Sequence, residues 1–238
     1  MVVRSRTGGT VSSKAPISVD VVSDVVCPWC YVGQRNLQRA QMTLDDVAKF
    51  TVRWRPYQLD PFLPPSGRGR KSYMLDKFGN AERIEEIHNR LREIGSEAGI
   101  SFDFDAISVS PNTLDAHRVI RWAATAGEEV QNNLVSQLFR LYFEKGANIG
   151  EHEVLTGAAQ EAGMDVAAVE ALLPTPADRS EVEAEIATAQ RMGVTGVPCF
   201  MLEGRYALMG VQPPQTLADA ITEVSETKAR GELDDDNT

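Results

Sequence analysis

The sequence predicts an α/β fold built from a β-α-β half and a β-β-α half, with a long helical block between them. Three observations lead to this prediction: a β-branched run followed by a helical pattern near the N-terminus, a central stretch with the 3.6-residue apolar period of helices, and two short apolar segments flanking a glycine-containing turn near the C-terminus. The central stretch implies five to seven short helices, which is too many for one crossover connection. It is therefore interpreted as a helical domain inserted between the two halves.

The β-α-β half starts with a strand from Ile17 to Val26, a mostly β-branched segment bounded by Pro16 and Pro28. A helix is expected from Pro28 to about Ala48, because proline fits the first helical turn, where its missing N–H leaves no bond unmade. Apolar and polar residues alternate from Phe50 to Leu59, which predicts a second strand that ends in a proline-rich turn.

The helical block runs from about Lys71 to Met192, and glycines mark the expected ends of its helices. One of these helices is expected to start near residues 110–113, where a proline fits the first turn. In the β-β-α half, residues 199–202 and 206–209 flank a short turn that contains Gly204, which predicts a β-hairpin. A final helix with one apolar face is expected after it.

These elements divide the chain into two domains with a tail at each end. The mixed domain comprises residues 16–65 and 193–228, and the helical domain comprises residues 66–192. Residues 1–15 are polar and rich in glycine and serine, and residues 229–238 are acidic, so both ends are predicted to be disordered.

The composition is that of a folded protein, with 42% hydrophobic and 24% charged residues among 238. The 24 Lys and Arg residues against 34 Asp and Glu residues give a formal net charge of −10. This charge argues against nucleic-acid binding, because contacts to phosphate supply most of that affinity. The short basic cluster of Arg68, Arg70 and Lys71 is interpreted as a solvated loop, with phosphate binding as the alternative.

No apolar run approaches the ~20 residues that a membrane-spanning helix needs, and the N-terminus lacks the apolar core of a secretory signal. We therefore expect a protein of the reducing cytoplasm, without a membrane or nucleic-acid partner. Three cysteines, Cys27, Cys30 and Cys199, cannot form a complete set of structural disulfides, so their number points to chemistry, metal binding or packing.

The strongest chemical motif is Cys27-Pro28-Trp29-Cys30, which lies where the first strand meets the first helix. Unpaired N–H groups and the positive end of the helix dipole stabilise a thiolate there, and the thiolate is the nucleophilic form of cysteine. Cys27 would attack a substrate disulfide, and Cys30, one turn further and more buried, would resolve the mixed disulfide. The reverse sequence of steps would oxidise a dithiol substrate.

Two different roles for the cysteine pair stay open. A structural zinc ion needs four ligands, and beyond the pair the chain offers only Cys199 and three histidines, His88, His117 and His152, without a second close ligand pair. The two cysteines could also be buried and chemically idle, although their place at a strand–helix junction argues against this. No metal and no obligatory cofactor are expected.

Four motifs occur in the order SDVVCPWC (23–30), RWRPYQL (53–59), PNTLDAHR (111–118) and GVTGVP (193–198). Together they resemble the DsbA-like oxidoreductases of the FrnE type, which are related to 2-hydroxychromene-2-carboxylate isomerase and to kappa-class glutathione transferases. The resemblance implies a thioredoxin-like fold with a helical insertion. It also implies that Cys27 is the nucleophile, that Cys30 is the resolving thiol, and that Val197-Pro198 is a cis-proline loop facing the substrate. A proline that merely starts a strand is the plainer interpretation of Pro198.

Two residues depart from the pattern of exported DsbA proteins. Trp29 stands where those proteins carry histidine, which is expected to make the redox centre less oxidising. Cys199 directly follows Pro198, where an apolar or aromatic residue is expected, and it is either a small buried hydrophobe or a third redox thiol. Asp24 is a candidate proton acceptor for Cys30, with a strand-end carboxylate as the alternative.

The leading functional hypothesis is a protein-disulfide oxidoreductase that acts on protein or small-molecule disulfides or dithiols, with glutathione as a candidate co-substrate. The first alternative is a glutathione-dependent isomerase or transferase of the 2-hydroxychromene-2-carboxylate isomerase type, or an accessory enzyme of a polyketide pathway. Retention of both cysteines argues against it, because those relatives commonly carry serine at the first position. The second alternative is a non-catalytic binding or chaperone-like module. A homodimer is the default expectation for assembly.

Overall fold

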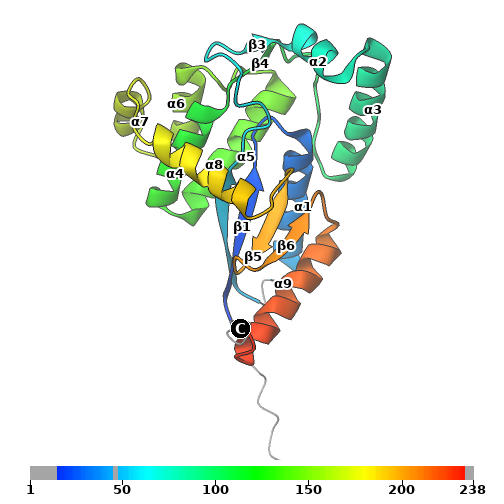
Figure 1. Cartoon of the computed structure of the whole chain (residues 1–238), viewed down its shortest axis with the longest axis vertical. Helices are drawn as coiled ribbons and strands as arrows, with labels where there is room; N and C mark the ends of the chain where they lie inside the picture. The colour runs from blue at the N-terminus through cyan, green and yellow to red at the C-terminus, as the bar shows by residue number, and fades with distance from the viewer. Residues whose placement is uncertain (1–14, 45–47, 234–238) are drawn as a thin grey trace, which may run out of the picture.

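The computed structural model describes residues 15–44 and 48–233, and its centre is a four-stranded mixed sheet in the order β2-β1-β5-β6 (Figure 1). Strand β1 lies parallel to β2 and antiparallel to β5, and β5 pairs antiparallel with β6. The strands are β1 (Ile17–Ser23), β2 (Phe50–Pro56), β5 (Cys199–Leu202) and β6 (Tyr206–Met209). The predicted thioredoxin-like α/β fold is confirmed.

Two helices of the mixed domain pack side by side beneath the insertion, as Figure 1 shows. They are α1 (Pro28–Leu44), which begins at the predicted proline, and α9 (Pro214–Ala229). Leu37 of α1, Ile221 of α9 and Val19 of β1 belong to one buried cluster, and each is at most 3% exposed. Burial of such side chains from water is the main stabilising contribution to this half of the fold.

The described residues between β2 and β5 form seven helices, within the predicted range, and these make the upper lobe in Figure 1. Two-residue strands also pair antiparallel there, an element that the sequence pattern did not predict. The elements of this lobe are β3 (Arg68–Gly69), α2 (Arg70–Phe78), α3 (Ala81–Glu97), β4 (Val109–Ser110), α4 (Leu114–Ala126), α5 (Glu128–Lys145), α6 (His152–Glu161), α7 (Val166–Leu172) and α8 (Arg179–Arg191).

Side chains at the start of α5 hold the outer edge of β2, which has no further strand beside it in the described sheet. Glu128 Oε1 accepts a hydrogen bond from the Val52 N–H at 2.6 Å, and Gln131 Oε1 accepts one from the Trp54 N–H at 3.1 Å. These two bonds satisfy backbone donors that a free sheet edge would leave unpaired. They also fix the helical lobe against the sheet.

Three sequence-based boundaries need correction. The first strand ends at Ser23 rather than Val26, because the chain turns at once and the Cys27 N–H bonds to the Asp24 carbonyl. The second strand ends at Pro56 rather than Leu59. The tail is ordered as far as Leu233, whose apolar side chain is buried in the main core. The remaining predictions of disorder, for residues 1–14 and 234–238, lie outside the described residues.

Among the helices of residues 15–44 and 48–233, none combines the length and the continuous apolar character of a membrane-spanning segment.

Candidate active site

The strand pairing brings three distant loops to one edge of the sheet. Strand β1 runs toward Cys27, and its residue Val22 lies opposite Cys199, the first residue of the antiparallel strand β5. The loop that enters β5 therefore lies beside the loop that leaves β1. Parallel strand β2 ends at the same edge, since Pro56 lies opposite Ser23.

Cys27 is the residue directly before α1, and its carbonyl accepts the first helical bonds, from the Cys30 N–H at 3.0 Å and the Tyr31 N–H at 3.3 Å. This is the N-cap position, where the helix dipole favours negative charge. All three cysteines are free thiols. Cys27 is 4% exposed and Cys30 is 1% exposed. Burial, and then the neighbouring Cys27 group, raise the pKa of the Cys30 thiol well above its usual value.

Val197 meets the Cys27 sulfur across the sheet edge. The Cys27 thiol donates to the Val197 carbonyl oxygen at 3.7 Å, and the Val197–Pro198 peptide bond is cis. Gly33 of α1 makes room for this loop, because a Cβ at that position would lie 3.1 Å from Pro198 Cγ and 3.2 Å from the Phe200 ring. The structure thus brings the sequence-predicted Cys27, Val197 and Pro198 together.

Asp24 is buried beside the cysteine pair, with only 1% of its side chain exposed. Its Oδ2 accepts the Leu59 N–H at 2.8 Å, and its Oδ1 lies 3.4 Å from His117 Nε2 without a hydrogen bond of its own. His117 Nε2 also contacts the Tyr57 carbonyl at 2.8 Å. Asp24 therefore ties the β2 exit loop and α4 to the loop that carries Cys27.

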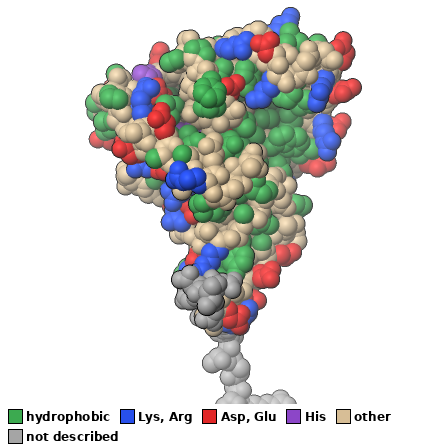
Figure 2. Space-filling model, viewed as in Figure 1, with side chains coloured by type: hydrophobic (Ala, Val, Ile, Leu, Met, Phe, Trp, Pro, Cys, Tyr) green, Lys and Arg blue, Asp and Glu red, His purple; other side chains and the backbone are tan. Residues whose placement is uncertain are grey.

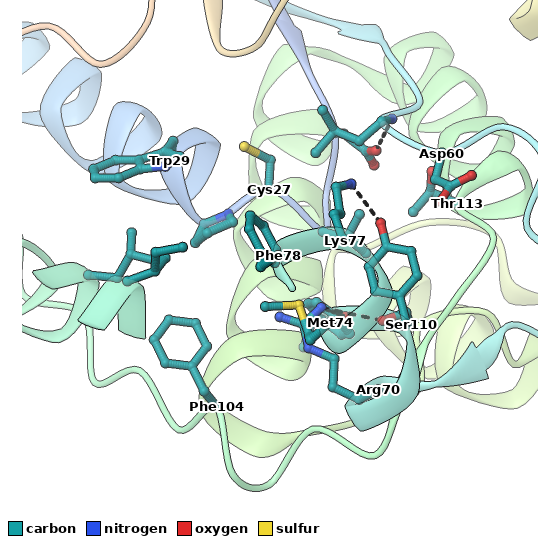
Figure 3. A pocket seen from close by; sticks show the side chains of 18 of the residues that line it. Cys27, Trp29, Asp60, Arg70, Met74, Lys77, Phe78, Phe104, Ser110 and Thr113 are labelled. Atoms are coloured by element: carbon teal, nitrogen blue, oxygen red, sulfur yellow. Dashed lines mark hydrogen bonds between the residues drawn. The ribbon is translucent and has the colours of Figure 1, made fainter. Parts of the chain in front are cut away.

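A cavity of about 670 Å³ opens beside Cys27, between the mixed domain and the helical lobe. Cys27, Trp29 and Val197 line one wall, and side chains of α2, α3 and the following loop line the opposite wall. Figure 3 shows Cys27 and Trp29 at one end of the view and Arg70 and Phe104 at the other. In Figure 2 hydrophobic side chains gather beside α3. A mostly apolar cavity with a few polar groups is typical of a small-molecule site.

The helical-lobe wall of this cavity was not predicted from the sequence, and one interpretation of its residues is wrong. Arg70 is not part of a solvated loop; it is half-buried at the start of α2 and lines the cavity, whereas Arg68 and Lys71 are exposed. The Arg70 guanidinium donates hydrogen bonds from Nη1 to the hydroxyls of Ser110 at 3.4 Å and Tyr142 at 3.3 Å. No local pattern signals contacts with residues so far along the chain.

Cys199 lies in a different buried cluster from the cysteine pair. It packs with Val22, Ala189, Val194 and Met201, while Cys27 and Cys30 belong to the main core. Cys199 is 0% exposed, and burial raises the pKa of its thiol. Within the described residues, no group of three or more histidine, cysteine or acidic side chains is arranged to hold a metal ion.

A model of the DSBA-like thioredoxin domain family matches residues 18–222 of the chain. The chain is also 24% identical over 213 residues to the uncharacterized protein YwbO of Bacillus subtilis (strain 168), an alignment that covers 89% of this chain and 99% of that protein.

Among solved structures, the chain is similar to a probable DsbA oxidoreductase from Streptomyces coelicolor, with 28% identity, 91% of each chain covered and a TM-score of 0.78. It also shares the fold of the cytosolic disulfide reductase DsbM from Pseudomonas aeruginosa, solved with glutathione (GSH). That match has 19% identity, covers 90% of this chain and 99% of the other, and has a TM-score of 0.58.

Proposed function

Because the chain belongs to the DSBA-like thioredoxin domain family, we propose that it is a thiol–disulfide oxidoreductase in which Cys27 is the nucleophile and Cys30 the resolving thiol. The observation that carries this proposal is the position of Cys27. Its sulfur lies at the start of α1 and beside the Val197 carbonyl, and a cavity adjoins it. Cys30 is more deeply buried and has a raised pKa, which suits a group that reacts second.

The reaction has two steps. The Cys27 thiolate attacks one sulfur of a substrate disulfide, a mixed disulfide forms, and the first substrate thiolate leaves. Cys30 loses its proton and attacks the Cys27 sulfur, so that a Cys27–Cys30 disulfide forms and the second substrate thiolate leaves. Two electrons pass from the protein to the substrate. The same steps in reverse oxidise a dithiol substrate.

Val197 and Pro198 are proposed to contact the substrate. The Val197 carbonyl already accepts from Cys27 and lies at the cavity wall, so backbone groups of this loop are placed to bond a substrate that bridges the sulfur and the loop. Trp29 lines the same wall and supplies an apolar contact surface.

Glutathione is the proposed partner that recycles the pair, by donating two thiols and leaving as its disulfide. The fold shared with a cytosolic disulfide reductase solved with glutathione supports this choice, and it also supports a cytoplasmic site of action. Cys30 favours an oxidoreductase over a glutathione-dependent isomerase, because isomerisation does not need a resolving thiol.

The test is a redox titration of the protein in glutathione buffers, followed by tryptophan fluorescence, to which Trp29 beside the pair contributes, and by mass spectrometry. We expect one reversible two-thiol transition in the wild-type protein and in Cys199→Ala, and none in Cys27→Ser or Cys30→Ser. A wild-type protein that shows no transition, or a Cys27→Ser variant that keeps it, would contradict the proposal. A stable adduct of glutathione on Cys27 in Cys30→Ser would identify the attacking residue directly.

A further inference from the structure

Arg70 brings an unpaired positive charge to the cavity. The side chain is half-buried and forms no ion pair with any carboxylate in the described part of the chain. Only Nη1 makes hydrogen bonds, both long, to Ser110 and Tyr142. Nε is buried without a partner, and Nη2 bonds to none of the described residues. A half-buried charge left without a counter-ion is unfavourable, so an anionic ligand would stabilise it.

His88 supplies a second, independent unsatisfied group on the same wall. The residue is 8% exposed and lines the cavity, and its Nε2 is buried without a hydrogen-bond partner. Its ring stacks on Phe104 with centroids 4.2 Å apart and planes at 11°. Burial, followed by the nearby Arg70 charge, lowers the pKa of His88, so the ring is neutral at pH 7 and can donate from Nε2 without adding charge.

Arg70 differs from the other cations at the cavity by being half-buried. Lys77, which donates to the Tyr73 hydroxyl at 2.7 Å, and Arg90 also line the cavity, but both are exposed and remain solvated. Asp24 and Asp60 line the cavity as well, and Asp24 already accepts the Leu59 amide. In Figure 3 Asp60 and Arg70 lie well apart in the view.

Apolar side chains line much of the cavity between this cationic end and the Cys27 sulfur. Figure 3 shows Phe78 and Met74 between Cys27 and Arg70, with Lys77 next to Phe78. A ligand that reaches from the guanidinium to the sulfur therefore needs an apolar body, because these apolar side chains offer no hydrogen bonds to a polar one.

We propose that this cavity binds a small-molecule disulfide or thiol that carries a carboxylate on an apolar body, with the carboxylate at Arg70 and His88 and the sulfur at Cys27. The inference rests on the proposed oxidoreductase function for its sulfur chemistry, which follows the two balanced steps given above. The anion subsite itself needs no redox step and can be tested without one.

The first experiment uses pre-reduced protein, freed of reductant, in stopped-flow single-turnover reactions. Two disulfide probes are compared at pH 7: the anionic dithiobis(nitrobenzoate) and the neutral dithiodipyridine. Each reaction is followed by the absorbance of the released group, the nitrothiobenzoate thiolate or the thiopyridone. For Arg70→Gln we expect the half-saturating concentration of the anionic probe to rise about tenfold or more, with the limiting rate constant within about twofold. The neutral probe should react as with wild type.

Two further variants sharpen the result. Lys71→Gln removes the same charge from the adjacent, exposed position and should change neither probe, which separates a bound anion from long-range attraction. His88→Phe keeps a ring on Phe104 but removes Nε2, and it should weaken only the anionic probe. Equal changes for both probes in Arg70→Gln, or equal effects of Lys71→Gln and Arg70→Gln, would overturn the proposal.

The second experiment measures binding of sulfur-free ligands by calorimetry to Cys27→Ser, which has no nucleophile. Naphthoate should bind, naphthamide should bind at least about tenfold more weakly, and the difference should vanish when Arg70→Gln is added. If naphthoate binds in this way while wild-type protein shows no Cys27-dependent exchange, the subsite stands and the oxidoreductase proposal fails. If exchange is normal but naphthoate and naphthamide bind alike, only the subsite fails, and a peptide substrate becomes the better candidate.

Discussion

The Cys27 sulfur and the Val197 carbonyl oxygen lie 3.7 Å apart although 170 residues separate them. Antiparallel pairing of Val22 with Cys199 accounts for this contact, because it aligns the exit of β1 with the entry to β5. The whole helical lobe lies between these two points in the sequence. The sheet can therefore fix the Cys27 sulfur while the lobe supplies a separate cavity wall. In the proposed function, ligand selection and sulfur chemistry thus rest on different elements.

The two thiols of the proposed redox pair, Cys27 and Cys30, should differ in reactivity. Burial and the neighbouring Cys27 group raise the pKa of Cys30, so Cys30 stays protonated at neutral pH and ionises only well above the ordinary thiol value of about 8.5. In reduced native protein we expect iodoacetamide to modify Cys27 first at pH 7, as measured by peptide mass spectrometry. Modification of Cys30 should rise steeply only in alkaline buffer.

The same raised pKa predicts how stability depends on pH. A thiol with a raised folded pKa contributes stability below its unfolded pKa, and this contribution is lost as the pH rises toward the folded value. The free energy of unfolding of the reduced protein should therefore fall above about pH 8.5. For the iodoacetamide experiment, the control is denatured protein, in which all three cysteines should be labelled alike. Faster labelling of Cys30 than of Cys27 in native protein at pH 7 would contradict the assignment of Cys27 as the nucleophile.

Asp24 is predicted to accept the proton that Cys30 releases. Its Oδ1 is buried next to the cysteine pair without a hydrogen-bond partner, 3.4 Å from His117 Nε2, while Oδ2 accepts a hydrogen bond from the Leu59 N–H. Asp24→Asn keeps an oxygen for Leu59 but removes the base, so resolution of a Cys27 mixed disulfide at pH 7 should slow by about tenfold or more. Stopped-flow measurement of the second thiolate release tests this.

The pH profile of the second step distinguishes a base from a residue that only positions a loop. If Asp24 is the base, the rate of the second step in Asp24→Asn should rise with pH until Cys30 ionises unaided, so that the rates of variant and wild type converge in alkaline buffer. Identical profiles for both proteins would leave Asp24 as a residue that only positions the Leu59 loop. Equal slowing of both thiolate releases at every pH would instead indicate a distorted site.

The cysteine pair and the hairpin could be predicted because their signals are local. A β-branched run ending before Pro28 fixes the strand–helix junction, and the hairpin turn follows from Glu203-Gly204, which adopt φ values of 53° and 67°. The helical insertion was readable from its apolar period for the same reason. These signals depend only on residues a few positions apart.

The cavity wall could not be predicted, because its residues acquire their roles from distant partners. Arg70 follows the two-residue strand β3, which has no periodic pattern, and Gly67 allows the close approach of β4: a Cβ there would lie 2.7 Å from the Ser110 carbonyl oxygen. The burial of His88 likewise depends on Phe104, which follows α3. The sequence identified Asp24 as a candidate proton acceptor, but it did not predict the contact between Asp24 and His117.

Cys199 is predicted to be a packing residue without a redox role. It lies in a separate apolar cluster, and burial raises the pKa of its thiol. Cys199→Ala should leave the redox midpoint of the Cys27–Cys30 pair unchanged and lower the free energy of unfolding by about 1–2 kcal/mol, since it leaves a small cavity. Mass mapping of oxidised wild-type protein should show only the Cys27–Cys30 bridge; a bridge to Cys199 would refute the prediction.

Arg118 is predicted to be the most stability-critical charged residue of the helical lobe. It is 0% exposed, its guanidinium lies 4.9 Å from the Trp122 ring centroid, and it pairs with Asp115 at 2.8 Å. The guanidinium also donates to four backbone carbonyls at the end of α7 and in the following loop to α8, those of Leu172, Leu173, Thr175 and Ala177. This one side chain thus holds the connection between α7 and α8 against α4.

Arg118→Met should lower the free energy of unfolding by about 3–5 kcal/mol, because it leaves Asp115 and several buried carbonyls without their donor. Arg118→Lys keeps the charge but loses the planar set of donors, so it should recover only part of this loss. The control is Arg140→Gln, whose exposed ion pair with Glu161 at 3.6 Å should contribute no more than about 1 kcal/mol. Urea unfolding measures all three. Similar losses for Arg118→Met and Arg140→Gln would mean that the α7–α8 connection is held by its apolar contacts, with Val169 and Leu173 in the core, rather than by the guanidinium.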